Sequence, residues 1–181
     1  MKIARQLKEE NVCEYLLYMW QVEDTIRAMG CDIDHIRSKY IPAFGLPEPE
    51  EKEEVKWFED LIRMMHEEGH TEKGHLQINQ STLMLLVDLH QQLLQSPKHP
   101  FYSAAYYKAL PYIVELRSRG DKGREVGELE TCFNCLYGVM MLRLQKKEIS
   151  TDTQTAVADV SHLLALLADA YKKEKQGELE L

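Results

Sequence analysis

The stretch STLMLLVDLHQQLLQ, residues 81–95, shows most clearly which kind of fold this chain adopts. Its apolar residues recur at steps of three and four, the spacing that places side chains on one face of an α-helix. The same spacing recurs almost throughout the sequence, and no stretch shows the sustained alternation of a half-buried strand. The sequence therefore predicts an all-α fold, a single-domain bundle of six or seven helices over residues 1–181.

Turn and capping residues set the expected helix boundaries. IPAFGLPEPE, residues 41–50, is the clearest break and predicts a proline-rich connection at 42–49. Asn79 or Ser81 is expected to cap the helix at 81–95. Pro111 should kink or split the helix at 101–119, because proline removes a backbone donor. The other helices are expected at 3–29, at 33–40, from the acidic run at 50–54 to Gly69, from Arg124 to Lys147 after Gly120 and Gly123, and from a cap at Ser150, Thr151 or Asp152 to Lys175.

Composition excludes several classes of partner. The chain has 181 residues and carries 22 Lys plus Arg against 30 Asp plus Glu, a net charge of −8. Such a balance repels phosphates, so neither nucleic acid nor a membrane surface is an expected partner. No apolar run approaches the roughly 18 residues of a membrane span, and the start lacks the apolar segment of a secretory signal. We expect a soluble, cytoplasmic protein whose four cysteines are thiols.

HEEGHTEKGH, residues 66–75, contains the zinc-protease pattern HExxH, formed by His66 and His70, with His75 close behind. A zinc protease needs both histidines on one face of a continuous helix, where they bind one metal ion. Gly69 predicts that the helix ends before His70, and helical rotation turns both histidines away from the apolar face. We therefore expect a solvated helix end rather than a zinc or di-iron site, and the sequence assigns no metal ligand, cofactor or catalytic residue.

The pair Cys132 and Cys135 has the CxxC spacing of redox and zinc motifs. Redox pairs usually follow a strand, whereas this pair falls within ELETCFNCLYGVMMLRL, a stretch with helical periodicity. Free cysteines behave there as small hydrophobic residues. A zinc site remains an alternative, and it would have to recruit Cys13 and Cys31.

Five residues form a candidate pocket. His90 lies in the middle of an apolar stripe, so it is expected to be buried and to need a partner, as a satisfied core residue or as a functional one. Glu14 and Tyr18 share one edge of the first helix, which is either a polar seam of a cleft or an ordinary solvent edge. Tyr102 and Tyr106 spread around the proline-containing helix, where tyrosine suits pockets, interfaces and plain core packing.

Four segments together resemble a known family: ENVCEYLLYMWQVED (10–24), GHLQIN (74–79), SAAYYKALPYIVELR (103–117) and CLYGVMMLRLQKKEIS (135–150). Over nearly its whole length the chain is similar to a bacterial, all-helical family catalogued as domain of unknown function 4924. The resemblance implies a single-domain helical fold in bacteria. It implies no activity, ligand or site residue.

These observations favour a cytoplasmic, non-enzymatic helical module that acts through protein contacts, with a protein partner or as a homodimer. The many-sided apolar character of the first helix and the aromatic residues of the helix at 101–119 support this interpretation. The alternative is a small-molecule or metal-binding enzyme. Its cleft would lie between the helices expected at 3–29, 81–95 and 101–119.

Overall fold

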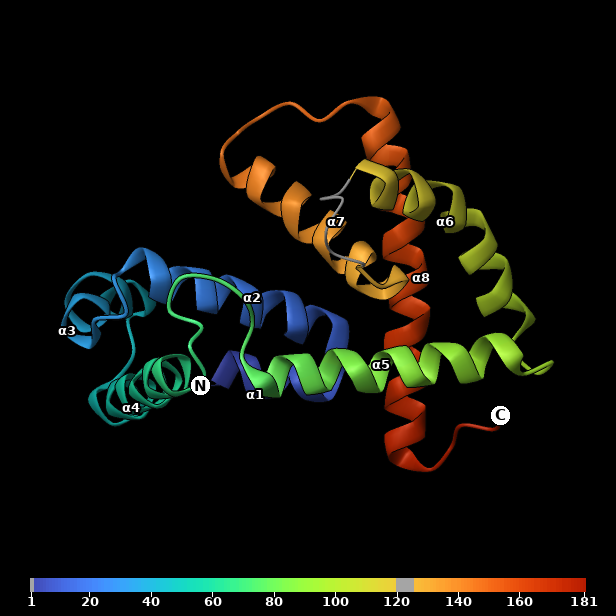
Figure 1. The fold of residues 1–181 in the computed structure, drawn as a ribbon. Coiled ribbons are helices and arrows are strands. Elements are labelled where there is room, and N and C mark those ends of the chain that lie inside the picture. The colour runs from blue at the N-terminus through green and yellow to red at the C-terminus, as the bar shows by residue number, and fades with distance from the viewer. Residues whose placement is uncertain (1, 120–125) are drawn as a thin grey trace. The chain divides into compact units, whose positions relative to one another are not determined.

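The computed structural model describes residues 2–119 and 126–181, and the regular elements in this part of the chain are helices (Figure 1). The all-α prediction is thus confirmed, although the eight α-helices of the described residues exceed the expected six or seven. They are α1 (Lys2–Glu10), α2 (Val12–Ala28), α3 (Ile33–His35), α4 (Glu48–Glu67), α5 (Gln77–Gln95), α6 (Pro100–Arg119), α7 (Glu128–Leu144) and α8 (Thr151–Gln176). A π-helical turn, Ile36–Tyr40, and a 3-10 turn, Ile41–Phe44, follow α3. Among the described residues, no helix combines the length and the apolar character needed to cross a membrane.

The extra helix arises because the helix expected at 3–29 is interrupted at Asn11, between α1 and α2. The Asn11 side-chain oxygen accepts a hydrogen bond from the backbone N–H of Cys13 at 3.1 Å. Asparagine in this position caps the start of a helix, so Asn11 begins α2 afresh. The apolar spacing continues across the break, which explains why the sequence pattern indicated one helix.

The start of α5 also differs from the expectation. Asn79 and Ser81 were expected to cap this helix, but it begins at Gln77 and both residues lie inside it. Asn79 is fully buried, and its side chain reaches a carboxylate of α2 instead of the backbone of its own helix. A tertiary hydrogen bond thus takes the place of the predicted cap.

The remaining boundaries lie close to the expected ones. Ser150 caps α8 by accepting the N–H of Thr153, and Gly177 ends α8 with φ of 72°. Pro111 does not split α6, which continues as one helix and changes direction along its length (Figure 1). The predicted start of the sixth helix at Arg124 and the glycines at 120 and 123 lie outside the described residues.

The structure divides into two compact units. The first unit contains the residues up to Glu9 and Glu14–Thr82. The second contains Glu10–Cys13 and Leu83–Leu181. The division falls inside α5 rather than in the proline-rich connection at 42–49. That connection instead lies within the first unit, which we call the N-terminal unit; the second is the C-terminal unit.

Each unit has its own apolar interior. In the N-terminal unit one face of α2 packs against α4 and the turns between them, and the interior contains Ala4, Tyr15, Met19, Val22, Ile26, Ile36, Ile41, Val55, Phe58, Leu61, Met65 and Leu76. In the C-terminal unit α6, α7 and α8 pack against one another. Its fully buried side chains include Leu86, Leu93, Ala109, Phe133, Val160, Leu163 and Leu167.

Candidate functional site

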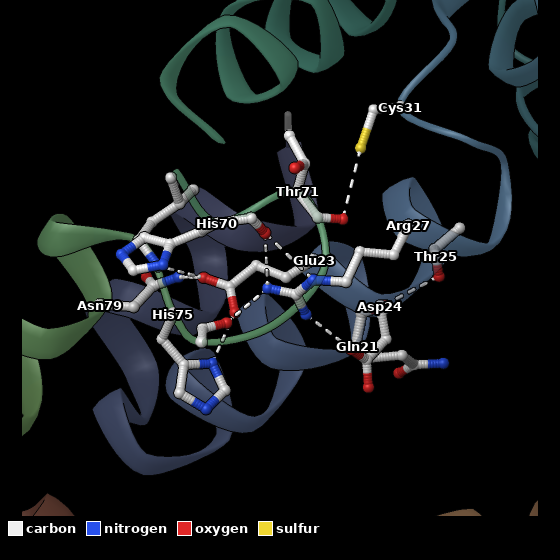
Figure 2. A network of polar contacts seen from close by, with 12 residues as sticks. Gln21, Glu23, Asp24, Thr25, Arg27, Cys31, His70, Thr71, His75 and Asn79 are labelled. Carbon is white, nitrogen blue, oxygen red and sulfur yellow. Dashed lines mark hydrogen bonds and ion pairs between the residues drawn. The ribbon is translucent and has the colours of Figure 1, made fainter. Parts of the chain in front are cut away.

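The carboxylate of Glu23, on α2, is the centre of a polar network inside the N-terminal unit (Figure 2). Glu23 is 0% exposed. Its Oε1 accepts hydrogen bonds from the Leu76 backbone N–H at 2.9 Å and from Asn79 Nδ2 at 2.6 Å. Its Oε2 lies 2.6 Å from His75 Nδ1. These three donors replace the water that the carboxylate loses on burial.

His75 is the one member of this set that reaches solvent, since its side chain is 30% exposed. Its ring stacks on Trp20, with the ring centroids 4.2 Å apart and the planes inclined by 14°. Because a carboxylate only accepts, Nδ1 carries the hydrogen, and in the neutral ring Nε2 is then a proton acceptor. A carboxylate that orients an imidazole in this way is also what general-base catalysis requires.

The segment between α4 and α5, residues 68–76, is fastened to α2 by backbone contacts as well. The Arg27 guanidinium donates to the carbonyl of His70, from both Nε and an amino nitrogen at 3.2 Å, and to the carbonyl of Gly74. The Cys31 thiol lies 3.9 Å from the Thr71 carbonyl. Figure 2 shows these groups converging on the loop from the end of α2. The network therefore has a clear structural role, which is to hold the loop in place.

The zinc-protease pattern is divided among different environments. As predicted, α4 ends at Glu67, before His70, and Gly69 follows with φ of 73°. His66 is exposed as expected. His70 is half-buried instead of fully solvated, because its ring lies against Gly74. His75 is bonded to Glu23, which the sequence did not indicate. Within the described residues no three His, Cys, Asp or Glu side chains are placed to hold one metal ion.

Glu23 was not among the predicted site residues, although one signal for its burial is present in the sequence. Glu23 lies three residues after Trp20 and three before Ile26, so it shares the buried side of α2 with them. A carboxylate on an apolar helix face is either exposed at its edge or buried with a partner. The partner comes from a loop 52 residues further along the chain, and local spacing does not reveal such a pairing.

In the C-terminal unit three of the candidate-pocket residues come together. His90 is 5% exposed, and its Nδ1 lies 2.5 Å from the hydroxyl of Tyr102. Its ring also meets that of Tyr106 edge to face, with the centroids 5.3 Å apart. Tyr106 in turn donates its hydroxyl to Glu128 at 2.8 Å. Hydrogen bonds and this ring contact thus join His90, Tyr102, Tyr106 and Glu128 into a second network.

Burial keeps His90, Tyr102 and Tyr106 of this second network uncharged. It lowers the pKa of His90, against an opposing effect of the Glu128 carboxylate. It raises the pKa of Tyr102, and together with the hydrogen bond to Glu128 it raises the pKa of Tyr106 to about 12. A neutral imidazole and neutral phenols are the expected state of a buried cluster near pH 7.

The two other candidate-pocket residues, Glu14 and Tyr18, lie one helical turn apart on α2, in the N-terminal unit. Glu14 is exposed and Tyr18 is half-buried. Burial raises the pKa of Tyr18, and the Tyr40 and Glu54 side chains near it add to that effect. The structure therefore places the five candidates in two separate units, with His90, Tyr102 and Tyr106 in the other one.

The CxxC pair lies within α7, where the sequence placed it, and all four cysteines of the chain are free thiols. Cys132 is fully buried, and burial raises the pKa of its thiol to about 12. Burial raises the pKa of Cys135 as well. A cysteine that is reactive without a metal usually has a lowered pKa, so this pair fits apolar packing in the C-terminal unit better than a redox role.

The outward side of α6 carries an apolar surface. Phe101 is 84% exposed, Tyr107 66% and Val114 56%. Ala104 and Pro111 lie between them and are exposed too. At steps of three and four residues, these five side chains form one stripe along the helix, which we call the α6 stripe.

Residues 2–119 and 126–181 thus form an all-helical structure with two side-chain networks and an exposed apolar stripe along α6. The profile of the family described as domain of unknown function (DUF4924) matches residues 1–178, and the chain belongs to this family. No curated protein matches the chain. No solved structure matches it either.

Proposed function

We propose that this chain is a bacterial, cytoplasmic, non-enzymatic module that acts through protein contacts, and that the α6 stripe is its binding surface. The observation that carries the proposal is the exposure of Phe101, Tyr107 and Val114 on one side of α6. Scattered exposed apolar residues are normal on a protein surface, whereas a contiguous run of them is typical of an interaction site. Aromatic side chains are also enriched where proteins bind one another.

A second copy of the chain suits this stripe. If two α6 helices pack antiparallel about a two-fold axis near Tyr107 and Lys108, Phe101 of one copy faces Val114 of the other. Ala104 then faces Pro111, and the Tyr107 side chains of the two copies lie beside the axis. Each copy carries a net charge of −8, so the copies also repel one another. Salt screens this repulsion, and self-association should strengthen as the salt concentration rises.

The test is sedimentation velocity over a dilution series at low and high salt. We expect the wild-type protein to move from monomer to dimer as its concentration increases. Tyr107→Ser and Phe101→Ser should shift the dissociation constant upward by at least about tenfold, the effect of losing a central aromatic contact. Met84→Ser is the matched control, because Met84 is 64% exposed on α5 and lies outside the stripe. A wild-type protein that stays monomeric at every concentration and salt would contradict self-association through α6.

The alternative function, an enzyme acting on a small molecule, has one specific observation in its favour. The buried carboxylate of Glu23 orients His75 and leaves Nε2 as a proton acceptor on a partly exposed ring. An activated ester such as p-nitrophenyl acetate probes this chemistry directly. An enzymatic role predicts hydrolysis that disappears in His75→Gln and persists in His66→Gln. Equal rates in the two variants would leave His75 with its structural role alone.

A further inference from the structure

Glu54, on α4, is a buried carboxylate with one oxygen that has no partner. The residue is 5% exposed, and Oε1 is buried without a hydrogen-bond donor among the described residues. Transferring a carboxylate out of water without replacing its hydrogen bonds costs stability. Burial accordingly raises the pKa of Glu54, and the positive charge of the chain's α-amino group opposes this effect without cancelling it. Within the described residues, this carboxylate is therefore open to a hydrogen-bond donor supplied by a ligand.

A pocket lies where such a donor could enter. Glu54 lines a cavity of about 300 Å³ in the N-terminal unit, next to Leu46. Lys2 and Arg5 of α1 line it as well, and Glu50 and Glu53 belong to the first turns of α4. Within the described residues neither Lys2 nor Arg5 forms an ion pair with any of these carboxylates. The cavity therefore presents basic and acidic groups that do not neutralise each other directly.

This charge pattern selects among small ligands. A purely cationic ligand would be repelled by Lys2 and Arg5, and a purely anionic ligand would be repelled by the carboxylates of α4. A ligand with one charge of each sign can contact both groups at once. The volume is at the lower end for small-molecule sites, which span about 300–1,000 Å³, so the ligand has few atoms.

We propose that this cavity binds a free amino acid, with its ammonium group donating to Glu54 and its carboxylate held by Lys2 and Arg5. The two oxygens of a carboxylate share its charge, so an ammonium group on the cavity side of Glu54 offsets the charge that is left without a donor at Oε1. The bound form thus gains a charge-assisted hydrogen bond that the empty form lacks. This inference goes beyond the proposed protein contacts, because the cavity lies in the N-terminal unit and the α6 stripe lies in the other.

The experiment uses the full chain with a panel of free L-amino acids at millimolar concentration, observed by saturation-transfer NMR and calorimetry. The comparison ligands are n-butylamine, which has only the amine, and butyrate, which has only the carboxylate. We expect at least one amino acid to bind and both comparison ligands to fail. Glu54→Gln should weaken binding about ten- to hundredfold, the effect of losing one charge-assisted hydrogen bond. Arg5→Ala should weaken binding as well, because it removes a positive charge that holds the carboxylate of the amino acid.

The controls separate binding from folding. Glu67→Gln removes an exposed carboxylate at the far end of α4 and should bind the amino acid as the wild type does. Glu54→Gln should unfold at the same temperature as the wild type or at a higher one, because it removes a buried charge. Three results would overturn the proposal: no amino acid binds, Glu54→Gln retains the wild-type affinity, or n-butylamine binds as tightly as the amino acid. None of them depends on the oligomeric state, which tests the α6 stripe separately.

Discussion

Two buried carboxylates of the N-terminal unit show how partners decide the role of a residue. Glu23 accepts from a backbone N–H, an amide and an imidazole, so its burial is compensated within the fold. Glu54 is buried almost as deeply, but one of its oxygens has no donor in the described part of the chain. A compensated carboxylate stabilises the structure, whereas an uncompensated one persists at a cost. We therefore assign Glu23 a structural role and Glu54 a ligand-binding one.

His90 makes the stability of the protein depend on pH in a defined direction. Burial lowers the pKa of His90 in the folded protein, against the effect of Glu128, so the native ring stays neutral when the unfolded ring takes up a proton. The protein therefore has its full stability when the pH is above the pKa of the unfolded histidine, about 6.5. Its stability falls as the pH drops from there toward the lower pKa of His90 in the folded protein. His90→Gln retains a polar group for Tyr102 without titrating in this range. The free energy of unfolding can be measured with urea at about pH 7.5 and about pH 5.5. It should decrease less between these two values for His90→Gln than for the wild type.

The other titratable groups around His90 are Tyr102, Tyr106 and Glu128. Both tyrosines stay neutral over this range because their pKa values are raised. His162 provides the matched control, since it is exposed on α8. Between the two pH values, His162→Gln should lose as much stability as the wild type does. If His90→Gln loses the same amount, His90 does not cause the pH dependence.

At the scale of single elements, local chemistry explains what the sequence could and could not predict. The end of α4 was predictable because Gly69 takes the left-handed conformation that favours glycine after a helix. The start of α8 was predictable because Ser150 caps it through its own side chain. The start of α5 was not, since Asn79 bonds to Glu23, which lies 56 residues away in the sequence. Helix ends follow the sequence where the capping partner is local.

The loop between α4 and α5 should depend on Gly74 for steric reasons as well as conformational ones. Gly74 has φ of 87°, and a Cβ added there would lie 2.8 Å from His70 Nδ1. Gly30 has φ of 72°, but a Cβ there meets no atom within 4 Å. Gly30→Ala should therefore cost only the left-handed strain, about 1 kcal/mol, and Gly74→Ala distinctly more. Chemical denaturation of both variants measures the difference.

A double-mutant cycle identifies the cause of that difference. His70→Ala removes the ring that the new methyl group would meet, so its combination with Gly74→Ala should recover the excess cost. The backbone strain remains in the double variant, as it does in Gly30→Ala. Equal costs for the two glycine substitutions would show that the loop moves aside and that the contact with His70 is unimportant.

For the whole molecule, the fold class could be predicted from the sequence, whereas the grouping of the helices into two compact units could not. Helical periodicity is local, and it indicated the all-α fold from stretches such as residues 81–95. The grouping into two units depends on contacts between distant segments, and the division inside α5 leaves no mark in composition. The candidate pocket shows the same limit. The sequence suggested that His90 would be buried with a partner, but it grouped His90 with Glu14 and Tyr18, which belong to the other unit.

The two units should also differ in their response to a local substitution, and this tests the prediction of a single domain. Glu23→Ala leaves Asn79, the Leu76 N–H and His75 without their acceptor, and should lower the free energy of unfolding of the N-terminal unit by about 3 kcal/mol. Hydrogen exchange followed by mass spectrometry should then speed up in α2 and α4 and stay unchanged in α6, α7 and α8, because exchange reports local cooperative units.

The control for this experiment is Asp24→Ala, next to Glu23 on the exposed side of α2. Asp24 pairs with Arg27 at 2.7 Å, but its side chain is 52% exposed, so its loss should cost less than about 1 kcal/mol. Little change in exchange is then expected in either unit. If Glu23→Ala instead speeds exchange equally in α2 and α8, the chain unfolds as one cooperative domain, as its sequence predicts. In that case the division inside α5 describes only where contacts are dense, because the continuous helix would transmit the destabilisation from one unit to the other.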